Sequence, residues 1–446
     1  MQRVHLISLG CPKNRVDSEV MVGKLQAGPF ELVDDPAAAD VIVVNTCSFI
    51  RPATEESVDT VLEMAKFKQQ GSCQKLIVTG CMVQRYGKDL ETELPEVDHF
   101  LGTGEYHRID ELLSRREDEL QRSYVDTPLY IHDEMAPRIN SWAAHSAYLK
   151  ISEGCDHRCA FCIIPQLRGK MRSRTVASLV AEATRLAEQG VVELTLVSQD
   201  STAYGRDLGD GSNIGTLVRA LARIPSIRWV RVHYLYPHGV PEELLRAMAE
   251  EEKVCRYLDI PLQHASSNML KAMRRGVTRE GQEKILSRIR SFVPDVSVRT
   301  TFIVGFPGET DQDFSELMDF VGAQRFDRLG VFTYFPEDGT PAATLEGQVA
   351  EKIKKDRQRQ IMNLQKKISR EKHKAILGKT VPVLIDGLSA ESEFILRGRM
   401  ASQAPDVDGQ VYIQSPPPNL KAGDIRMVKI LKAAAYDLVG EIRDSA

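Results

Sequence analysis

Six short apolar segments in the middle of the chain alternate with segments whose apolar residues recur at helical spacing, and this alternation limits the choice of fold. The apolar segments are Tyr148–Ile151, Glu193–Val197, Trp229–His233, Tyr257–Ile260, Val296–Val304 and Leu329–Tyr334. Continuous apolar runs between helices are typical of parallel strands covered on both faces. We therefore predict an α/β protein whose central domain, residues 141–372, is a partial (β/α)6 barrel with its chemistry at the carboxyl ends of the strands.

Three cysteines follow the first of these segments, at the end where such a barrel places its chemistry. Cys155, Cys159 and Cys162 have the spacing C-x3-C-x2-C. Thiolates are soft ligands that select zinc, copper(I) or iron–sulfur clusters. A structural zinc site needs four protein ligands, whereas three thiolates suit a 4Fe–4S cluster with one iron left open. Two alternatives stay open: a zinc site with His157 as the fourth ligand, and cysteines that are close by chance.

Residues 1–120 place a single cysteine after each of three further predicted strands. The strands are Val4–Leu9, Val41–Asn45 and Leu76–Thr79, and the cysteines are Cys11, Cys47 and Cys81. Because the carboxyl ends of parallel strands meet at one edge of a sheet, we predict a parallel α/β domain with a second three-thiolate site. The alternative is buried free cysteine, which packs as a small hydrophobe. Cys73 and Cys255 lack such a partner spacing, and we interpret them as structural.

The last part of the chain changes its period from helical to strand-like. A strongly charged helical segment over residues 351–376 is either a nucleic-acid or ribosome contact or a solvated helix between two domains. Residues 375–446 contain five short strand patterns, which predict a small antiparallel β-barrel. From Lys379 to Asp444 this barrel carries eight Lys and Arg against nine Asp and Glu, a net charge of −1. A module that grips RNA phosphates should be basic, so this one is better suited to a basic protein.

The composition excludes several classes of protein. The net charge of −4 and the pI near 6.3 argue against a protein that holds nucleic acid by bulk electrostatics. The N-terminal segment is too short and too polar for a signal peptide, and no apolar run approaches the length of a membrane span. We expect a cytoplasmic protein that does not enter a membrane. In that reducing compartment the eight cysteines are better explained as metal ligands than as a disulfide framework.

The cysteine loop, with Phe161 before its last cysteine, resembles the radical S-adenosylmethionine superfamily. The whole chain resembles the methylthiotransferases of that superfamily, whose C-terminal barrel is a TRAM domain. Six segments resemble the RimO-type branch, which modifies an aspartate in small-subunit ribosomal protein twelve: Gly10–Glu19, Asn45–Ile50, Ser152–His157, Cys162–Pro165, Tyr234–Pro237 and Pro261–Ser266. The segment Tyr334–Thr340, at the sixth strand end, departs from the usual family pattern.

The resemblance implies two 4Fe–4S clusters and S-adenosylmethionine as cofactors. The first cluster would be held by Cys155, Cys159 and Cys162 and would cleave S-adenosylmethionine to a 5′-deoxyadenosyl radical. The auxiliary cluster would be held by Cys11, Cys47 and Cys81 and would carry the sulfur. No side chain is expected to be catalytic by itself, because the cofactors supply the reactivity. Residues expected to line the S-adenosylmethionine pocket are Phe161, Gln199, Gly305 and Glu309.

The implied reaction adds a methylthio group to the β-carbon of the substrate aspartate. The implied partners of this monomeric enzyme are the ribosomal protein, either free or in the ribosomal subunit, and an electron donor such as a flavodoxin or ferredoxin. The C-terminal barrel would hold the substrate protein. Two alternatives are a tRNA adenosine methylthiotransferase of the related MiaB type and a non-catalytic zinc-binding or RNA-binding adaptor.

Overall fold

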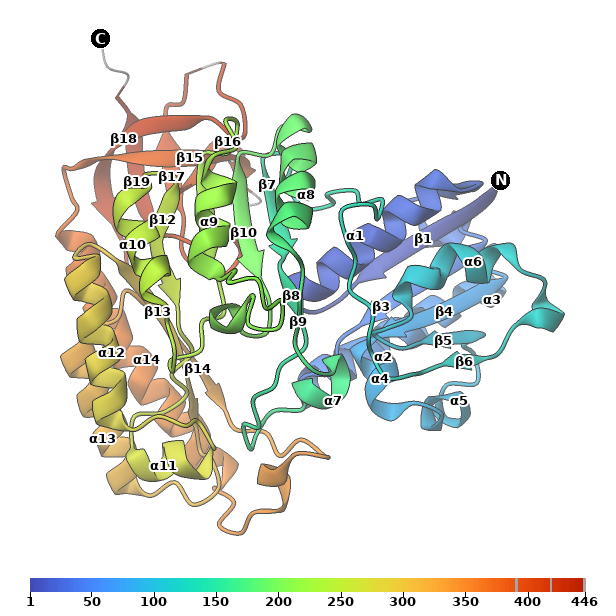
Figure 1. Ribbon diagram of the computed structural model, residues 1–446, viewed down its shortest axis with the longest axis horizontal. Helices are drawn as coiled ribbons and strands as arrows, with labels where there is room; N and C mark the ends of the chain where they lie inside the picture. The colour runs from blue at the N-terminus through green and yellow to red at the C-terminus, as the bar shows by residue number, and fades with distance from the viewer. Residues whose placement is uncertain (390–391, 418, 444–446) are drawn as a thin grey trace.

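The computed structural model describes residues 1–389, 392–417 and 419–443. Residues 444–446, the end of the predicted C-terminal domain, lie outside it, as do Glu391 and Asp444 from the barrel's charge count. Two six-stranded sheets and a closed C-terminal barrel follow one another along the chain (Figure 1). None of the helices in the described ranges combines the length and apolar character of a membrane span.

The N-terminal sheet is parallel throughout and has the strand order β2-β1-β3-β4-β5-β6. The three predicted strands form its centre, and the other three are too short to give a sequence pattern. Its strands are β1 (Gln2–Ser8), β2 (Phe30–Leu32), β3 (Val41–Thr46), β4 (Lys75–Gly80), β5 (His99–Leu101) and β6 (Ser123–Tyr124). Its helices are α1 (Pro12–Ala27), α2 (Arg51–Ala65), α3 (Phe67–Gln70), α4 (Cys81–Tyr86), α5 (Asp89–Glu93) and α6 (Ile109–Ser114).

Strand β3 shows why the strands of this domain appear in the sequence as continuous apolar runs. All six of its residues are buried. Val41 and Val43 pack in the same cluster as Val20 of α1, whereas Val44 packs with Val61 of α2. Alternate side chains of a strand point to opposite faces, so a strand covered by helices on both sides needs an apolar residue at every position.

The central sheet is also parallel, and its strands follow sequence order as β14-β13-β12-β11-β10-β7. The predicted six-stranded partial barrel is confirmed. The strands are β7 (Ser146–Lys150), β10 (Glu193–Val197), β11 (Trp229–Val232), β12 (Val254–Asp259), β13 (Ser297–Val304) and β14 (Arg328–Thr333). The helices are α7 (Ile164–Arg168), α8 (Val176–Glu188), α9 (Ile214–Ala222), α10 (Glu242–Glu250), α11 (Ser267–Ala272), α12 (Arg279–Phe292), α13 (Asp311–Gln324) and α14 (Glu351–Lys374).

The C-terminal barrel closes in the order β15-β16-β17-β19-β18. Its strands are β15 (Thr380–Ser389), β16 (Ser392–Met400), β17 (Val411–Gln414), β18 (Ile425–Ala433) and β19 (Leu438–Ile442). Four pairings are antiparallel, but β17 and β19 are parallel. The prediction of an antiparallel barrel therefore holds for four pairings out of five. The reason is geometric, since strand direction cannot alternate all the way around a closed ring with an odd number of strands.

The barrel docks on the central sheet through buried ion pairs near the amino ends of its strands. Arg399 of β16 donates to both carboxylate oxygens of Glu193, the first residue of β10, at 3.2 and 2.7 Å. Arg231 of β11 also binds Glu193, at 3.1 Å. All three side chains are buried. The carboxyl ends of the central strands are thus left free for the N-terminal domain.

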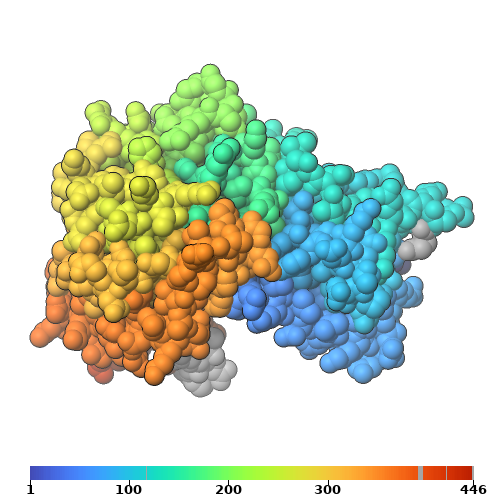
Figure 2. All heavy atoms as spheres, turned by 90° about the horizontal axis from the view of Figure 1, so that it is seen from below, coloured from blue at the N-terminus to red at the C-terminus, as the bar shows by residue number. Residues whose placement is uncertain are grey.

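The sixth strand end connects the central domain to the N-terminal domain. Glu337 Oε1 accepts a hydrogen bond from the Arg51 amide at the start of α2 (2.7 Å), and Oε2 accepts one from Arg85 Nη1 (2.9 Å). Figure 2 shows this orange segment reaching the blue N-terminal domain. Because Glu337 and Arg85 are both buried, the segment that departs from the family pattern is a domain contact.

Candidate functional site

The central cysteine triplet lies on a loop between the two-residue strand β8 (Ser152–Glu153) and α7. Backbone hydrogen bonds hold the loop: Cys155 N donates to Gly169 O (3.1 Å), Cys162 N to Cys159 O (3.1 Å) and Ala160 N to Met273 O (3.0 Å). Strand β8 pairs with β9 (Arg172–Ser173) behind the loop. The three thiols are therefore held by contacts to α11 as well as by their own turn.

Cys11, Cys47 and Cys81 lie at the same edge of the N-terminal sheet, because β1, β3 and β4 are neighbours in it. Cys11 precedes α1, Cys47 follows β3 and Cys81 begins α4. A side chain at Gly10 would place its Cβ 2.6 Å from Cys47 Cβ. The backbone before Cys11 thus packs directly against Cys47.

A left-handed glycine precedes one or two cysteines of each triplet. Gly10, Gly80 and Gly154 have φ values of +87°, +98° and +86° and stand immediately before Cys11, Cys81 and Cys155. This conformation is accessible to glycine at little cost and strained for other residues. A Cβ at Gly80 would also lie 2.6 Å from the Thr46 carbonyl oxygen. The repeated Gly-Cys pair turns the chain sharply where a strand ends and the cysteine begins.

The thiols of both triplets lie in surroundings that disfavour a bare thiolate. Burial raises the pKa of Cys47 to about 12, of Cys155 to about 11 and of Cys162 to about 12, and neighbouring thiols of the same triplet add to each shift. A thiolate is the form that binds metal, and metal binding releases the thiol proton. Within each set the neighbouring thiols interact electrostatically, and thiolates of this kind are the ligands that an iron–sulfur cluster takes.

One arginine contacts each triplet, and sequence reasoning found neither of them. Arg168 Nη2 donates to Cys81 Sγ at 3.4 Å, and Arg275 Nη1 donates to Cys159 Sγ at 3.4 Å. Both arginines are buried. Arg168 ends α7, six residues after Cys162, and the only signal for it would have been its place beside the cysteine loop. Hydrogen bonds to cluster sulfur tune the cluster's reduction potential.

Arg168 belongs to a buried network of charges between the two triplets. Its Nη1 donates to Asp17 Oδ2 (2.6 Å) and to Glu153 Oε2 (3.2 Å). Lys150 Nζ donates to the same Glu153 oxygen at 2.7 Å and also binds Asp17. Burial raises the pKa of Glu153, but Lys150 and Arg168 outweigh it and the net shift is downward. Two cations and two carboxylates balance, as buried charges require.

The same network explains the motif Gly10–Glu19. Asn14 donates to Leu9 O at 2.7 Å and accepts from Arg168 at 3.1 Å. Glu19 accepts a hydrogen bond from Arg138 Nε at 2.8 Å. The polar residues of the motif, all on α1, therefore join the N-terminal sheet to the central domain beside Cys81.

The expected S-adenosylmethionine residues fall in three places. Phe161 packs with a buried cluster that contains Phe306, the neighbour of Gly305. Gln199 donates to Glu153 Oε1 at 2.5 Å, which places it beside the start of the cysteine loop. The Glu309 carboxylate accepts from the Gly305 amide and lies 3.4 Å from Arg357 Nη1. Glu309 thus holds the turn at Gly305, and its carboxylate is already bound by the protein.

Several buried polar atoms near the strand ends fit a polar cofactor. Among the described residues, Gln199 Oε1, Gln263 Oε1 and the Tyr334 hydroxyl have no hydrogen-bond partner. Gln263 also has a φ of +73°, and Tyr234 a φ of +59°. Unpaired buried groups are costly, and backbone strain of this kind gathers at functional sites. The amino, carboxylate and hydroxyl groups of a cofactor such as S-adenosylmethionine are of the chemical kind that pairs with such atoms.

His157 is held by other residues than the cysteines. Its Nε2 lies 2.7 Å from Asp200 Oδ2, and its ring stacks on Tyr236 with centroids 3.7 Å apart. The fourth zinc ligand of the alternative interpretation is therefore bound to a carboxylate. The remaining cysteines lie elsewhere: Cys73 donates to Lys75 O (3.4 Å), and Cys255 packs in a cluster with Leu384 of the barrel.

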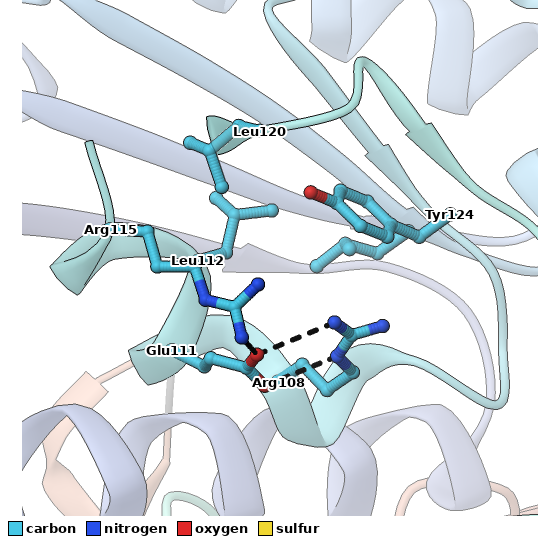
Figure 3. Close-up of a pocket in the computed structure, with 7 residues that line it drawn as sticks. Arg108, Glu111, Leu112, Arg115, Leu120 and Tyr124 are labelled. Atoms are coloured by element: carbon cyan, nitrogen blue, oxygen red, sulfur yellow. Dashed lines mark hydrogen bonds and ion pairs between the residues drawn. The ribbon is translucent and has the colours of Figure 1, made fainter. Parts of the chain in front are cut away.

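Two hollows lie away from the cysteines. Figure 3 shows a cleft between α6 and β6, where Glu111 is bound by Arg108 and Arg115; its volume of about 10 Å³ is that of one water. A larger groove of about 500 Å³ lies between the C-terminal end of α1, residues 134–139 and α8. Gly23, the first α1 residue that lines it, lies twelve residues after Cys11, about 18 Å along the helix.

Comparison with known proteins identifies the three parts of the chain. Residues 3–102 match the model described as Uncharacterized protein family UPF0004, residues 149–321 match the Radical SAM superfamily, and residues 377–442 match the TRAM domain. A solved radical S-adenosylmethionine methyltransferase, TsrM from Kitasatospora setae, is similar in fold, with a TM-score of 0.55 and 17% identity over 77% of each chain.

Relatives of known name cover the whole length. The ribosomal protein uS12 methylthiotransferase RimO of Anaeromyxobacter sp. (strain Fw109-5) is 51% identical over 99% of this chain and 93% of its own. The protein of the same name from Pelobacter propionicus is 48% identical over 99% of this chain and 98% of its own. The chain therefore belongs to the RimO family of methylthiotransferases, within the radical S-adenosylmethionine superfamily.

Proposed function

We propose that this chain adds a methylthio group to the β-carbon of an aspartate in ribosomal protein uS12. The observation that carries the proposal is the pair of cysteine triplets, one at the edge of the N-terminal sheet and one after the first strand of the central sheet, with Arg168 of α7 reaching Cys81. We assign the work to three domains, residues 1–120, 141–372 and 375–446. The relatives named for uS12 supply the substrate class.

The cysteines would hold two 4Fe–4S clusters, one on Cys155, Cys159 and Cys162 and one on Cys11, Cys47 and Cys81. With S-adenosylmethionine bound, these groups supply a radical for an unactivated C–H bond, a sulfur atom and a methyl group. A one-electron donor of the flavodoxin or ferredoxin class is also required. Everything else in the reaction falls to the protein, which must orient the cofactor and the aspartate and keep water out.

The chain's own residues suit those tasks. Arg168 and Arg275 donate to one thiol in each triplet and so stabilise the negative charge of metal-bound sulfur. Gln199, Gln263 and Tyr334 offer buried polar atoms to S-adenosylmethionine. These groups are already positioned by the fold, which lowers the entropy lost on binding.

Lys13 is placed to bind the substrate carboxylate. It follows Cys11 by two residues, and its ammonium lies 3.6 Å from the centre of the Tyr234 ring. Tyr234 stands at the carboxyl end of β11, so Lys13 reaches across from the N-terminal domain to the central sheet. A cation beside Cys11, at the carboxyl end of β11, is the complement that an aspartate side chain needs.

A mass measurement on the substrate tests the proposal. Anaerobically purified enzyme, S-adenosylmethionine, a reductant, sulfide and uS12 should give uS12 with one added methylthio group. Replacement of Cys11, Cys47 and Cys81 by Ala should leave cleavage of S-adenosylmethionine intact and abolish the mass gain. Replacement of Cys155, Cys159 and Cys162 should abolish both.

The matched control replaces Cys73 and Cys255, the two buried cysteines outside the triplets, and should change neither readout. Methylthio groups found on a tRNA adenosine, with none on uS12, would support the tRNA alternative and overturn the proposal. Zinc in place of iron in the purified protein would contradict it as well.

A further inference from the structure

Helix α14 concentrates positive charge in a chain that is acidic overall. Its 24 residues contain ten Lys and Arg against three Asp and Glu, a net charge of +7. The whole chain has a net charge of −4, so the other residues sum to −11. Figure 1 draws α14, in orange, beside α13 and β14, on the side of the central domain away from the N-terminal domain.

Six of the seven exposed cations of α14 lie along one face, which we call the α14 stripe; the seventh, Lys367, lies beside it. The six recur every three, four or seven residues, and at 100° per residue they fall within an arc of about 100°. All are exposed: Lys352, Lys355, Arg359, Lys366, Arg370 and Lys374. The opposite face, with Ile361, Gln365 and Ile368, is buried. The stripe runs the length of the helix, about 36 Å for 24 residues.

The cations of α14 fall into two groups, those that bind another residue of the protein and those that do not. Lys354 donates to the Tyr334 carbonyl (2.8 Å), Arg357 to Asp311 (2.8 Å) and Lys372 to Asp327 (2.6 Å). Within the stripe, Arg359 binds Asp356. The other five stripe residues form no ion pair with any residue that the structure describes. A merely solvated helix usually intersperses acids with its bases at i,i+4 spacing. Here the one acid within the arc of the stripe is Asp356, and it is bound by Arg359.

The stripe begins at the reactive edge of the central sheet. Lys354 packs against Gly305, where a Cβ would meet its side chain. Arg357 donates to the Glu309 carbonyl at 3.1 Å. These contacts fix the first turns of α14 beside the strand ends expected to bind S-adenosylmethionine. A long anion lying on the stripe would therefore extend to the same edge as the substrate.

We propose that the α14 stripe binds the phosphate backbone of an RNA helix, and that the enzyme thereby engages uS12 within the assembled ribosomal subunit. A row of cations, five of which form no ion pair with any described residue, matches a row of phosphates, and such contacts position a protein without reading sequence. The second half of this inference rests on the proposed function, because only that function makes the RNA ribosomal. The near-neutral C-terminal barrel is then left to hold the protein.

RNA binding and activity are tested separately. Binding is followed by fluorescence anisotropy of a labelled RNA duplex of about 20 base pairs, long enough to cover α14, over a series of salt concentrations. The variant K355Q/R359Q/K366Q removes three stripe charges and keeps helix-forming side chains. The control R223Q/R228Q/K88Q removes three exposed cations from other surfaces.

We expect the stripe variant to bind RNA at least about tenfold more weakly at physiological salt, and its log–log salt slope to fall by about three. The control should match the unaltered protein. With assembled small subunit as substrate, the stripe variant should lose methylthio transfer by a similar factor. With free uS12 as substrate, the stripe variant should keep its methylthio transfer activity.

Equal RNA binding by the stripe variant and the unaltered protein would overturn the inference. So would an unaltered protein that binds acidic vesicles or polyglutamate but not the duplex, or a stripe variant that loses activity equally on free uS12 and on the subunit. Failure of the proposed function is distinguishable, because the unaltered protein would then modify neither substrate while RNA binding could still be measured.

Discussion

Replacing Arg168 by Met tests whether the buried charge network holds the two cysteine-bearing domains together. The change removes one of two cations that face Asp17 and Glu153, and leaves a surplus buried negative charge. Removing one partner of a buried ion pair costs about 3–5 kcal/mol. Because Lys150 still contacts both carboxylates, we expect the lower end, about 3 kcal/mol.

Hydrogen exchange of the α1 amides measures this loss where it occurs. A change of about 3 kcal/mol in the free energy of opening corresponds to a fall in protection of roughly 150-fold. Adding Asp17→Asn to Arg168→Met removes the surplus charge, so we expect the double variant to regain part of the protection. Such coupling is the signature of residues that share one network.

The control is Arg246→Met, which breaks an exposed pair with Glu242 and should change stability by less than about 1 kcal/mol. Unchanged protection of α1 in the Arg168 variant would refute the reasoning. The reasoning would also be refuted if the double variant lost more protection than the Arg168 variant by the whole amount that Asp17→Asn costs on its own. Such additivity would show that the two charges are not coupled.

Three further outcomes follow from particular residues. Burial lowers the pKa of His132 to about 4, so below about pH 6.5 the unfolded chain binds a proton that the folded protein does not bind. Urea titrations should therefore show that the free energy of unfolding falls by about 2 kcal/mol between pH 7 and pH 5. The His132→Gln variant should show a smaller fall over the same range. Gly80→Ala forces a Cβ against the Thr46 carbonyl at a positive φ and should cost about 1–3 kcal/mol and about half of the bound iron, with the Cys155 triplet still loaded. Glu337→Gln removes the charge that binds Arg85 and should raise exchange of the Arg51 amide about tenfold, a loss of about 1.4 kcal/mol; unchanged exchange would mean that this contact does not hold the domains.

Sequence patterns were sufficient wherever a feature is local. Strand β10 has the predicted bounds, Glu193–Val197, because its residues alone decide that it is apolar and extended. Cys11, Cys47 and Cys81 come together because parallel topology alone places them at one edge. By contrast, β2 and β5 have three residues each, too few for a period to be recognised.

Contacts between distant segments could not be predicted. The contact between Arg168 and Cys81 depends on how α7 packs on α4. The two residues are 87 positions apart, and no sequence pattern between them records the contact. The same is true of Arg275 and Cys159, which are 116 residues apart. The charged segment over residues 351–376 had two interpretations because only packing decides which cations are buried. In the structure Lys354 and Arg357 are buried, and the α14 stripe is not.

The buried pairing of Arg399 with Glu193 and Arg231 limits how this architecture can be recombined. A foreign barrel grafted onto the central domain would leave Glu193 and Arg231 facing whatever residue it carries in place of Arg399. An uncompensated buried charge costs several kcal/mol, enough to erase much of a domain's stability. Chimaeras that exchange substrate preference between relatives should therefore transfer positions 193, 231 and 399 as one unit, wherever the chain is cut.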